Sequence, residues 1–212
     1  MIKTLNRKYF VFIGIIIFTL LILTIFIFII MPREKPVELI KEDAFYGMLE
    51  NGDIICRLGD RLWSQIFKDF SADDKRFSHI GIIRIIDEHI TVIHAEGTTK
   101  PEKDFVKEES INDFLKVARE IGVYRIMNLD GNKISGMAME YINVPFDWKF
   151  DMSDKSELYC TELLYIILKQ LMPAFEFNTV YIKELGRNII PIDSISNSEY
   201  FSEIYFSGNK VN

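Results

Sequence analysis

The chain has 212 residues and a formal net charge of −6, which suggests one domain with appendages. Its basic residues are not gathered into runs, so the composition argues against a nucleic-acid partner. The sequence also lacks a C-x-x-C pair, an H-E-x-x-H motif and a glycine-rich phosphate loop, which excludes the common zinc, redox and nucleotide motifs.

The N-terminal segment differs from the rest of the chain. Residues 10–31 carry no charge, and as a helix they would extend roughly 33 Å, enough to cross the hydrocarbon core of a membrane. A cleaved signal peptide is the alternative, but this apolar stretch is long for one and lacks a small-residue cleavage site. Lys3, Arg7 and Lys8 precede it, so a single-pass anchor would leave the N-terminus in the cytoplasm and the main domain outside. The predicted parts are an N-terminal transmembrane anchor over 1–31, a linker over 32–41 and one domain over 42–212.

The next part of the chain predicts a short helix, a strand and a hairpin. Apolar spacing favours helices over 39–50 and 61–70, with a buried strand over 53–57 between them. Residues 77–86 and 90–96 are rich in β-branched side chains, and the tight connection Asp87-Glu88-His89 joins them. Pairing about position 88 places His79 near residue 97, at the open end of the hairpin and close to His94 and Glu96. His89, in the turn, is expected to be exposed and inert.

The second half predicts mainly helices. Ser110 is expected to cap a helix over 111–119, and Asp130 to cap one over 132–142. Between them, residues 122–127 predict a strand. An apolar helix over 159–171 is stopped by Pro173, and a further helix is expected over 180–186. Because hairpins imply an antiparallel sheet with helices before and after it, the fold class is predicted to be α+β.

Cys160 is the residue that most suggests chemistry. It falls in the first turn of the helix over 159–171, with Asp154 or Ser156 as a possible cap, where unpaired amide N–H groups favour a thiolate and lower the thiol pKa. A buried cysteine in the core is the alternative. A disulfide with Cys56 is another, although Cys56 lies on a strand and is interpreted as a core side chain. A cysteine near a histidine and a third polar group is the minimum apparatus for covalent acyl transfer.

Several segments together carry a resemblance to a known family. They follow one another in chain order: Gly52-Asp53-Ile54-Ile55, Phe77-Ser78-His79-Ile80-Gly81-Ile82, Val92-Ile93-His94-Ala95, Val123-Tyr124-Arg125, Phe146-Asp147-Trp148-Lys149-Phe150-Asp151 and Leu158-Tyr159-Cys160-Thr161-Glu162-Leu163. On these the chain resembles the permuted papain-like amidases of the YaeF/YiiX type, relatives of the NlpC-type cell-wall peptidases. In ordinary papain-like enzymes the cysteine helix precedes the histidine sheet, whereas here the histidine comes first.

The resemblance implies a role for each site residue. Cys160 is the expected nucleophile, His79 its base, and His94 the third polar residue, with Glu96 in reserve. Tyr124 and Tyr159 are expected to shape the substrate-binding site. The implied domain over 42–212 is a circularly permuted papain-like (NlpC-like) catalytic domain.

The implied function is a cysteine amidase or peptidase of the cell envelope that needs no cofactor. Its substrate would be a peptide or acyl amide, with cell-wall peptides favoured by kinship alone. Hydrolysis or transfer of lipid acyl groups on the same site is an alternative, and a non-catalytic binding module is another. A zinc site made by His79, His94, Glu96 and Cys160 is a further rival, although its spacing matches no known zinc motif. The sequence predicts no oligomeric state.

Overall fold

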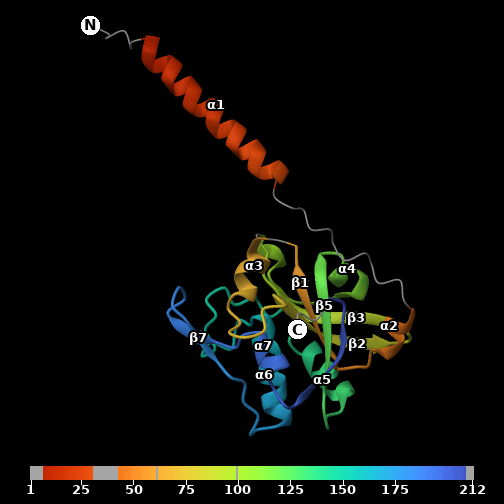
Figure 1. The fold of residues 1–212 in the computed structure, drawn as a ribbon. Helices are drawn as coiled ribbons and strands as arrows, with labels where there is room; N and C mark the ends of the chain where they lie inside the picture. Colours follow the sequence, from red (N-terminus) through yellow and green to blue (C-terminus); the bar gives the residue numbers. More distant parts are fainter. Residues whose placement is uncertain (1–6, 31–42, 61, 99, 209–212) are drawn as a thin grey trace. The chain divides into compact units, whose positions relative to one another are not determined.

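The computed structural model describes residues 7–30, 43–60, 62–98 and 100–208. It divides into two compact units, Met1–Glu34 and Lys35–Asn212. The first unit contains one helix, α1 (Arg7–Ile30) (Figure 1). A search of the described residues finds no helix with the length and apolar character needed to span a membrane. Residues 1–6 and 31 of the predicted anchor, and the predicted linker over 32–41, lie outside the described residues.

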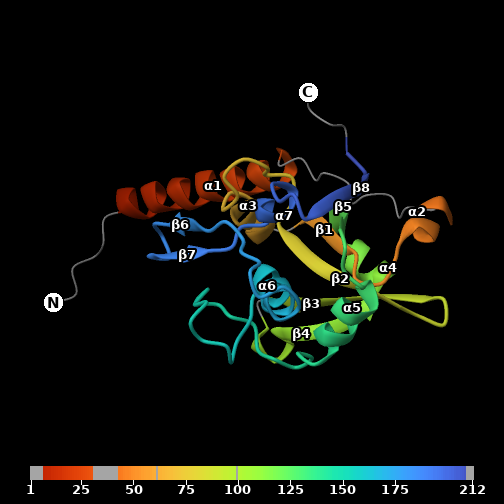
Figure 2. The ribbon, with the colours of Figure 1, turned by 90° about the horizontal axis from the view of Figure 1, so that it is seen from below.

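The second unit is built on a six-stranded antiparallel sheet (Figures 1 and 2). The strands lie in the order β4-β3-β2-β1-β5-β8. Their bounds are Ile54–Gly59 for β1, His79–Ile86 for β2, His89–Glu96 for β3, Phe105–Ser110 for β4, Ala118–Ile126 for β5 and Phe201–Phe206 for β8. The predicted α+β class with an antiparallel sheet is confirmed.

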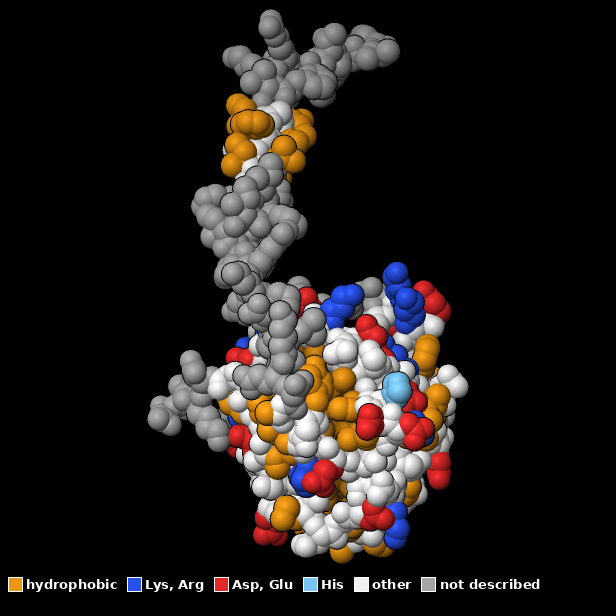
Figure 3. Space-filling view, turned by 90° about the vertical axis from the view of Figure 1, so that its right-hand side faces the viewer, with side chains coloured by type: hydrophobic (Ala, Val, Ile, Leu, Met, Phe, Trp, Pro, Cys, Tyr) orange, Lys and Arg blue, Asp and Glu red, His pale blue; other side chains and the backbone are white. Residues whose placement is uncertain are grey.

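Helices cover both faces of this sheet because side chains alternate along each strand. Ile54 and Cys56 of β1 join the core beneath α5 (Gly131–Met139) and α6 (Cys160–Leu171). Ile55, between them, joins a second core formed with α2 (Asp43–Met48) and α4 (Ile111–Leu115). The remaining elements are α3 (Leu62–Lys68), η1 (Pro101–Lys103), the hairpin of β6 (Val180–Ile182) and β7 (Arg187–Ile189), and α7 (Asp193–Ser196). On the face seen in Figure 3, acidic and basic side chains are interspersed.

The predicted hairpin is present and slightly tighter than expected. β2 and β3 pair from Ile86↔His89 to Ile82↔Ile93, so the turn consists of Asp87 and Glu88 alone. Both residues have positive φ, 47° and 67°, the conformation that fits the right-handed twist of the flanking strands. His89 begins β3 rather than lying in the turn, and its side chain is exposed as expected.

Both predicted helix caps are confirmed, although the helices are shorter than predicted. The Ser110 hydroxyl accepts a hydrogen bond from Asp113 N, and the Asp130 carboxylate accepts one from Asn132 N. α4 ends at Leu115 because the chain enters β5 at Ala118.

The helix predicted over 180–186 is wrong. The segment forms a β-hairpin instead, turning at Gly186, whose φ of +68° ends any helix there. Strands β4 and β8 were not predicted, because charged or polar residues interrupt their apolar pattern.

Gly81 allows β3 to lie close to β2 beside the site. A Cβ at this position would lie 2.3 Å from Val92 Cγ1 and 3.3 Å from His94 Cβ. We predict that Gly81→Ala destabilises the domain by about 1–3 kcal/mol, because overpacking strains a closely packed sheet. Urea unfolding measures the change.

The matched control is Gly136→Ala on α5, where an added Cβ meets nothing within 4 Å. This variant should be neutral or more stable by about 1 kcal/mol, since alanine is the better helix former. Equal destabilisation by both substitutions would contradict the packing argument.

Candidate active site

Cys160 is the first residue of α6, as expected, but the cap differs from the prediction. Tyr159 is the N-cap and makes no side-chain capping bond. Asp154 instead accepts hydrogen bonds from Ser156, so neither predicted cap reaches the helix. Glu162, which is fully buried, accepts a hydrogen bond from the Tyr159 backbone, as in half of a capping box. Burial raises the pKa of Glu162 to about 7.

The thiol of Cys160 lies among backbone donors. The N–H groups of Ile80, Thr161 and Cys160 itself favour the thiolate, but burial is the larger effect and raises the pKa of Cys160 to about 11. The lowered thiol pKa expected at a helix N-terminus is therefore outweighed by desolvation. Cys56 is fully buried in the core, and both cysteines are free, so the alternative of a disulfide is excluded in this structure.

His79 is the first residue of β2 and is hydrogen-bonded to His94. Its Nε2 lies 2.8 Å from Nδ1 of His94 across the hairpin, which confirms the expected proximity. The ring of His79 stacks on Phe114 of α4, with the ring centroids 5.9 Å apart. Burial, followed by the positive charge of Arg57, lowers the pKa of His79 well below 6.5. The imidazole is therefore neutral at physiological pH.

His94 is fully buried and contacts the carboxylate of Glu109, a residue that the sequence did not indicate. Its Nε2 lies 3.0 Å from Oε1 of Glu109 on β4, and the described residues offer it no other partner. Burial raises the pKa of Glu109, but the contacts with His94 and Lys107 outweigh it and hold that pKa at about 2. Glu109 is thus ionised beside the imidazole.

Glu96, the reserve third residue, has different partners. Its Oε1 lies 2.9 Å from Arg57 and its Oε2 lies 2.6 Å from Lys107. Lys107 also lies 2.9 Å from Glu109, so two cations and two carboxylates form one network around the histidines. Strand alternation along β4 would have indicated Glu109 if that strand had been predicted.

The contacts determine which nitrogen carries each proton. Ionised Glu109 can only accept, so Nε2 of His94 carries a hydrogen and Nδ1 does not. Nδ1 of His94 then accepts the Nε2 hydrogen of His79 across the 2.8 Å contact. This assignment leaves Nδ1 of His79 with a free lone pair, which is the atom a base requires.

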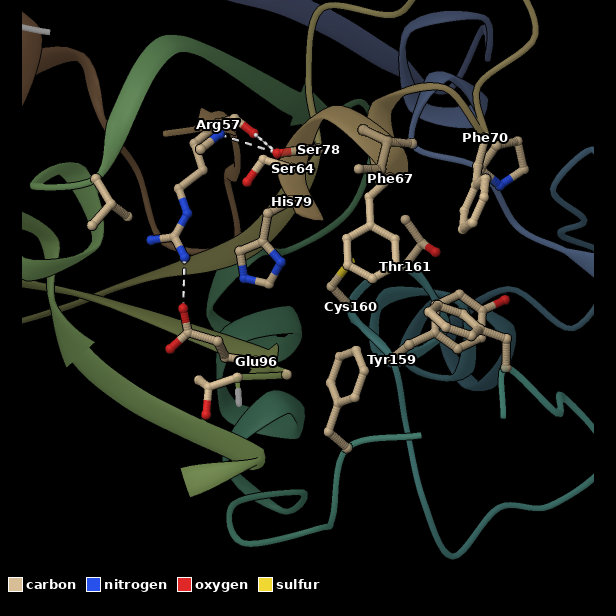
Figure 4. A pocket seen from close by; sticks show the side chains of 18 of the residues that line it. Arg57, Ser64, Phe67, Phe70, Ser78, His79, Glu96, Tyr159, Cys160 and Thr161 are labelled. Atoms are coloured by element: carbon tan, nitrogen blue, oxygen red, sulfur yellow. Dashed lines mark hydrogen bonds and ion pairs between the residues drawn. The ribbon is translucent and has the colours of Figure 1, made fainter. Parts of the chain in front are cut away.

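Cys160 and His79 line the same cavity, of about 560 Å³ (Figure 4). Figure 4 shows the two side chains next to each other, with Glu96 and Arg57 beyond His79. In the part of the chain that the structure describes, no hydrogen bond joins the Cys160 thiol to the His79 imidazole. Catalytic hydrogen bonds are often long before substrate binds, so the absence of this bond does not exclude a nucleophile–base pair.

The two tyrosines predicted to bind substrate differ in position. Tyr159 lines the cavity, and its hydroxyl oxygen accepts a hydrogen bond from Ile190 N at 3.0 Å. Tyr124 is buried in the core and is not among the residues that line the cavity. Its hydroxyl bonds Glu203 and Arg76 instead, at 2.9 and 2.8 Å. The structure thus places Tyr124 away from any substrate in this cavity.

The fold and the cavity define a papain-like cysteine hydrolase whose histidine strand precedes its cysteine helix. A family model described as "Permuted papain-like amidase enzyme, YaeF/YiiX, C92 family" matches residues 48–191. The chain therefore belongs to this family of permuted papain-like amidases, as the sequence motifs predicted.

Solved structures confirm the fold. The chain is similar to a crystal structure titled metalloprotein yiiX from Escherichia coli O157:H7, with a TM-score of 0.61 and 15% sequence identity. The match covers 74% of this chain and 96% of that chain. A search of curated proteins gives no match.

The acidic cluster beside the site already has a cation from the protein itself. His94, Glu96 and Glu109 each offer a ligand atom, all within 4.8 Å of one another. The Lys107 ammonium lies within 2.9 Å of both carboxylates, and Nδ1 of His94 is bonded to His79, which leaves Nε2 as the possible ligand atom of His94. The protein's own cation thus occupies the place where a metal ion would neutralise the carboxylates. The zinc site considered from the sequence, made by His79, His94, Glu96 and Cys160, includes Glu96, whose carboxylate is likewise paired with Lys107.

The neutral thiol predicts how Cys160 reacts with alkylating agents. Because burial raises its pKa to about 11, the thiolate fraction should rise about tenfold per pH unit between pH 7 and 9. Iodoacetamide labelling, followed by mass spectrometry, should show that increase at Cys160, while buried Cys56 stays unlabelled until the protein unfolds. A labelling rate independent of pH over this range would show a preformed thiolate–imidazolium pair instead.

Proposed function

We propose that the chain hydrolyses amide bonds through an acyl-enzyme on Cys160, with His79 as the base. The observation that supports this most directly is the placement of both side chains on one cavity, with the His79 ring oriented by His94. Kinship with amidases favours an amide over other acyl compounds.

The protonation states determine the first step. Since the thiol and the imidazole are both neutral at rest, Nδ1 of His79 takes the thiol proton as sulfur attacks the carbonyl carbon. A C–S bond forms, and the carbonyl oxygen becomes an oxyanion. Backbone N–H groups at the start of α6 stabilise that charge. The imidazolium then gives its proton to the leaving amine as the C–N bond breaks.

Water completes the reaction. His79 removes a proton from a water molecule that attacks the thioester, and the imidazolium returns this proton to sulfur as the C–S bond breaks. The products are a carboxylic acid and the free enzyme. No cofactor takes part.

Glu109 acts on this mechanism through His94. An ionised carboxylate on Nε2 of His94 fixes the hydrogen of each imidazole and stabilises the positive charge that His79 gains during attack. We propose Glu109 as a positioning residue, the fourth member of a Cys160–His79–His94–Glu109 chain. Glu96 bonds Arg57 and Lys107 and makes no hydrogen bond to either imidazole.

The substrate and location remain proposals from the sequence. Cell-wall peptides follow only from kinship with NlpC-type enzymes. An extracytoplasmic location follows only from the charges before the apolar segment. A non-catalytic binding module would leave the ordered imidazole pair without a role.

Removing the nucleophile or the base tests the proposal directly. Cys160→Ala should abolish turnover of a fluorogenic N-acyl amide, since no acyl-enzyme can form. His79→Ala should reduce kcat by a factor on the order of 10² to 10⁴, the usual contribution of a general base. His94→Ala should have a smaller effect than His79→Ala, and the reverse ranking would show that their roles are exchanged. Thermal unfolding of each variant verifies that it is folded.

Glu109→Gln tests the positioning role against a matched control. Removing the charge should lower kcat by a factor on the order of 10 to 100 and alter the ¹⁵N chemical shifts that report the histidine tautomers. Glu96→Gln removes a carboxylate from the same network without a hydrogen bond to either imidazole, so it should leave those shifts unchanged. Equal effects of the two variants would mean that Glu109 serves only stability.

A further inference from the structure

Glu162 is a buried carboxylic acid that the proposed mechanism does not use. It is the third residue of α6, two positions after Cys160, and its side chain is fully buried. Its Oε1 lies 3.0 Å from Nζ of Lys155, and its Oε2 has no hydrogen-bond partner among the described residues. A buried polar atom without a partner is costly, so this acid calls for an explanation.

The partner of Glu162 belongs to a loop that borders the catalytic cavity. Lys155 is exposed near the end of this loop, which covers residues 147–157. Phe150 of the loop lines the cavity, as Cys160 does. The ion pair between Lys155 and Glu162 therefore connects a loop of the cavity wall to the turn that carries the nucleophile.

The same carboxylate also fixes the backbone directly before the nucleophile. Glu162 accepts a hydrogen bond from the backbone of Tyr159, the N-cap of α6, which makes no side-chain capping bond of its own. An acid three positions after the N-cap forms half of a capping box in this way. One side chain thus holds both Lys155 of the loop and the residue that precedes Cys160.

Stability alone does not account for an acid in this place. Burial, which is the largest effect, and the charge of Asp147 raise the pKa of Glu162 from its ordinary 4.5 to about 7, against the opposing effect of Lys155. The folded protein therefore binds more protons than the unfolded chain between these two values, so the contribution of Glu162 to stability falls as the pH rises through them. The ionised form costs stability, although it is the form that pairs with Lys155.

On the basis of the proposed function, we infer that Glu162 is a positioning residue for the nucleophile. Its ionised carboxylate, paired with Lys155, holds the loop over residues 147–157 against the first turn of α6 and keeps that turn in place on the cavity. Protonation of the carboxylate weakens the ion pair and lets the loop and the turn separate. The enzyme is then most active when Glu162 is charged, although the fold is more stable when it is neutral.

Two charges, both on the loop, act on Glu162 most strongly. They are those of Lys155 and Asp147, and the phenol of Tyr159 lies near enough that Glu162, after burial, raises its pKa. The elements α5, β2 and β3 also pack against α6, and their ionisable residues are Lys133, His79, Arg84, His89, His94 and Glu96. The protonation of Glu162 is thus coupled mainly to the loop that it holds.

The pH dependence of turnover tests this role in the full-length protein. The kcat/KM of the wild type for the fluorogenic amide should rise about tenfold between pH 6 and pH 8, as the ionised fraction of an acid with a pKa of about 7 does. The catalytic pair does not titrate in this range, because burial raises the pKa of Cys160 to about 11 and lowers that of His79 well below 6.5.

Glu162→Gln imitates the neutral acid and should give a flat profile. We expect kcat/KM at pH 8 to fall by a factor on the order of 10 to 100, the usual effect of a small displacement of catalytic groups. A rise near pH 7 that survives in this variant, or full activity at pH 8, would overturn the positioning role.

Two lysine variants test the ion pair itself. Lys155→Met removes the cation beside the buried acid, so the midpoint of the profile should move to higher pH by roughly one unit or more. Lys149→Met is the matched control, because Lys149 is exposed on the same loop and pairs with Glu157 at 3.5 Å. It should keep the midpoint of the wild type, and an equal shift in both variants would contradict the assignment.

Urea unfolding at pH 8 distinguishes positioning from support of the fold. Glu162→Gln should be at least as stable as the wild type, because it removes a buried charge whose surroundings disfavour it. A variant that loses stability together with activity would mean that Glu162 serves only the fold.

Mass spectrometry of quenched reactions separates this inference from the proposed function. The wild type should carry the acyl group on Cys160, and Glu162→Gln should acquire it more slowly at pH 8. Equal rates of acylation would overturn the positioning role alone. Absence of acylation in the wild type would overturn the proposed function, and the role of Glu162 with it.

Discussion

The hydrogen bond between His79 and His94 is the interaction on which the site depends. It forms because β2 and β3 are joined by a turn of only two residues, which fixes the register along the whole hairpin. That register brings the two imidazoles to the open end of the hairpin, and α6 brings Cys160 to the same cavity. A slip of β3 by one residue would turn the His94 ring to the opposite face of the sheet, away from His79.

The imidazoles are kept neutral by their surroundings and oriented by a balanced set of charges. Arg57, Lys107, Glu96 and Glu109 are all partly or fully buried, and their charges cancel. Such a network is stable only as a whole, because removal of one member leaves a poorly solvated charge without its partner. Burial, and after it the cation Arg57, lowers the pKa of His79, while the network also provides, through His94, a carboxylate for its charged form.

The sequence predicted the parts that depend on local patterns. The hairpin, the caps at Ser110 and Asp130 and the helix that begins near Cys160 were found from alternation, turn residues and helical spacing. Glu109 was not found, because β4 carries three consecutive charged side chains, at 107–109, which are typical of a solvated loop until the strand pairs with β3. The raised pKa of the thiol was also missed, since burial at a helix terminus depends on tertiary packing rather than on helix position.

The protonated state of Cys160 has a consequence for its survival. Oxidation to a sulfenic acid requires the thiolate, and a thiol whose pKa is raised to about 11 presents little of it between catalytic cycles. In the proposed mechanism, the sulfur becomes a thiolate only when His79 removes its proton. The burial that raises the pKa of this thiol therefore also slows its expected oxidation by peroxide.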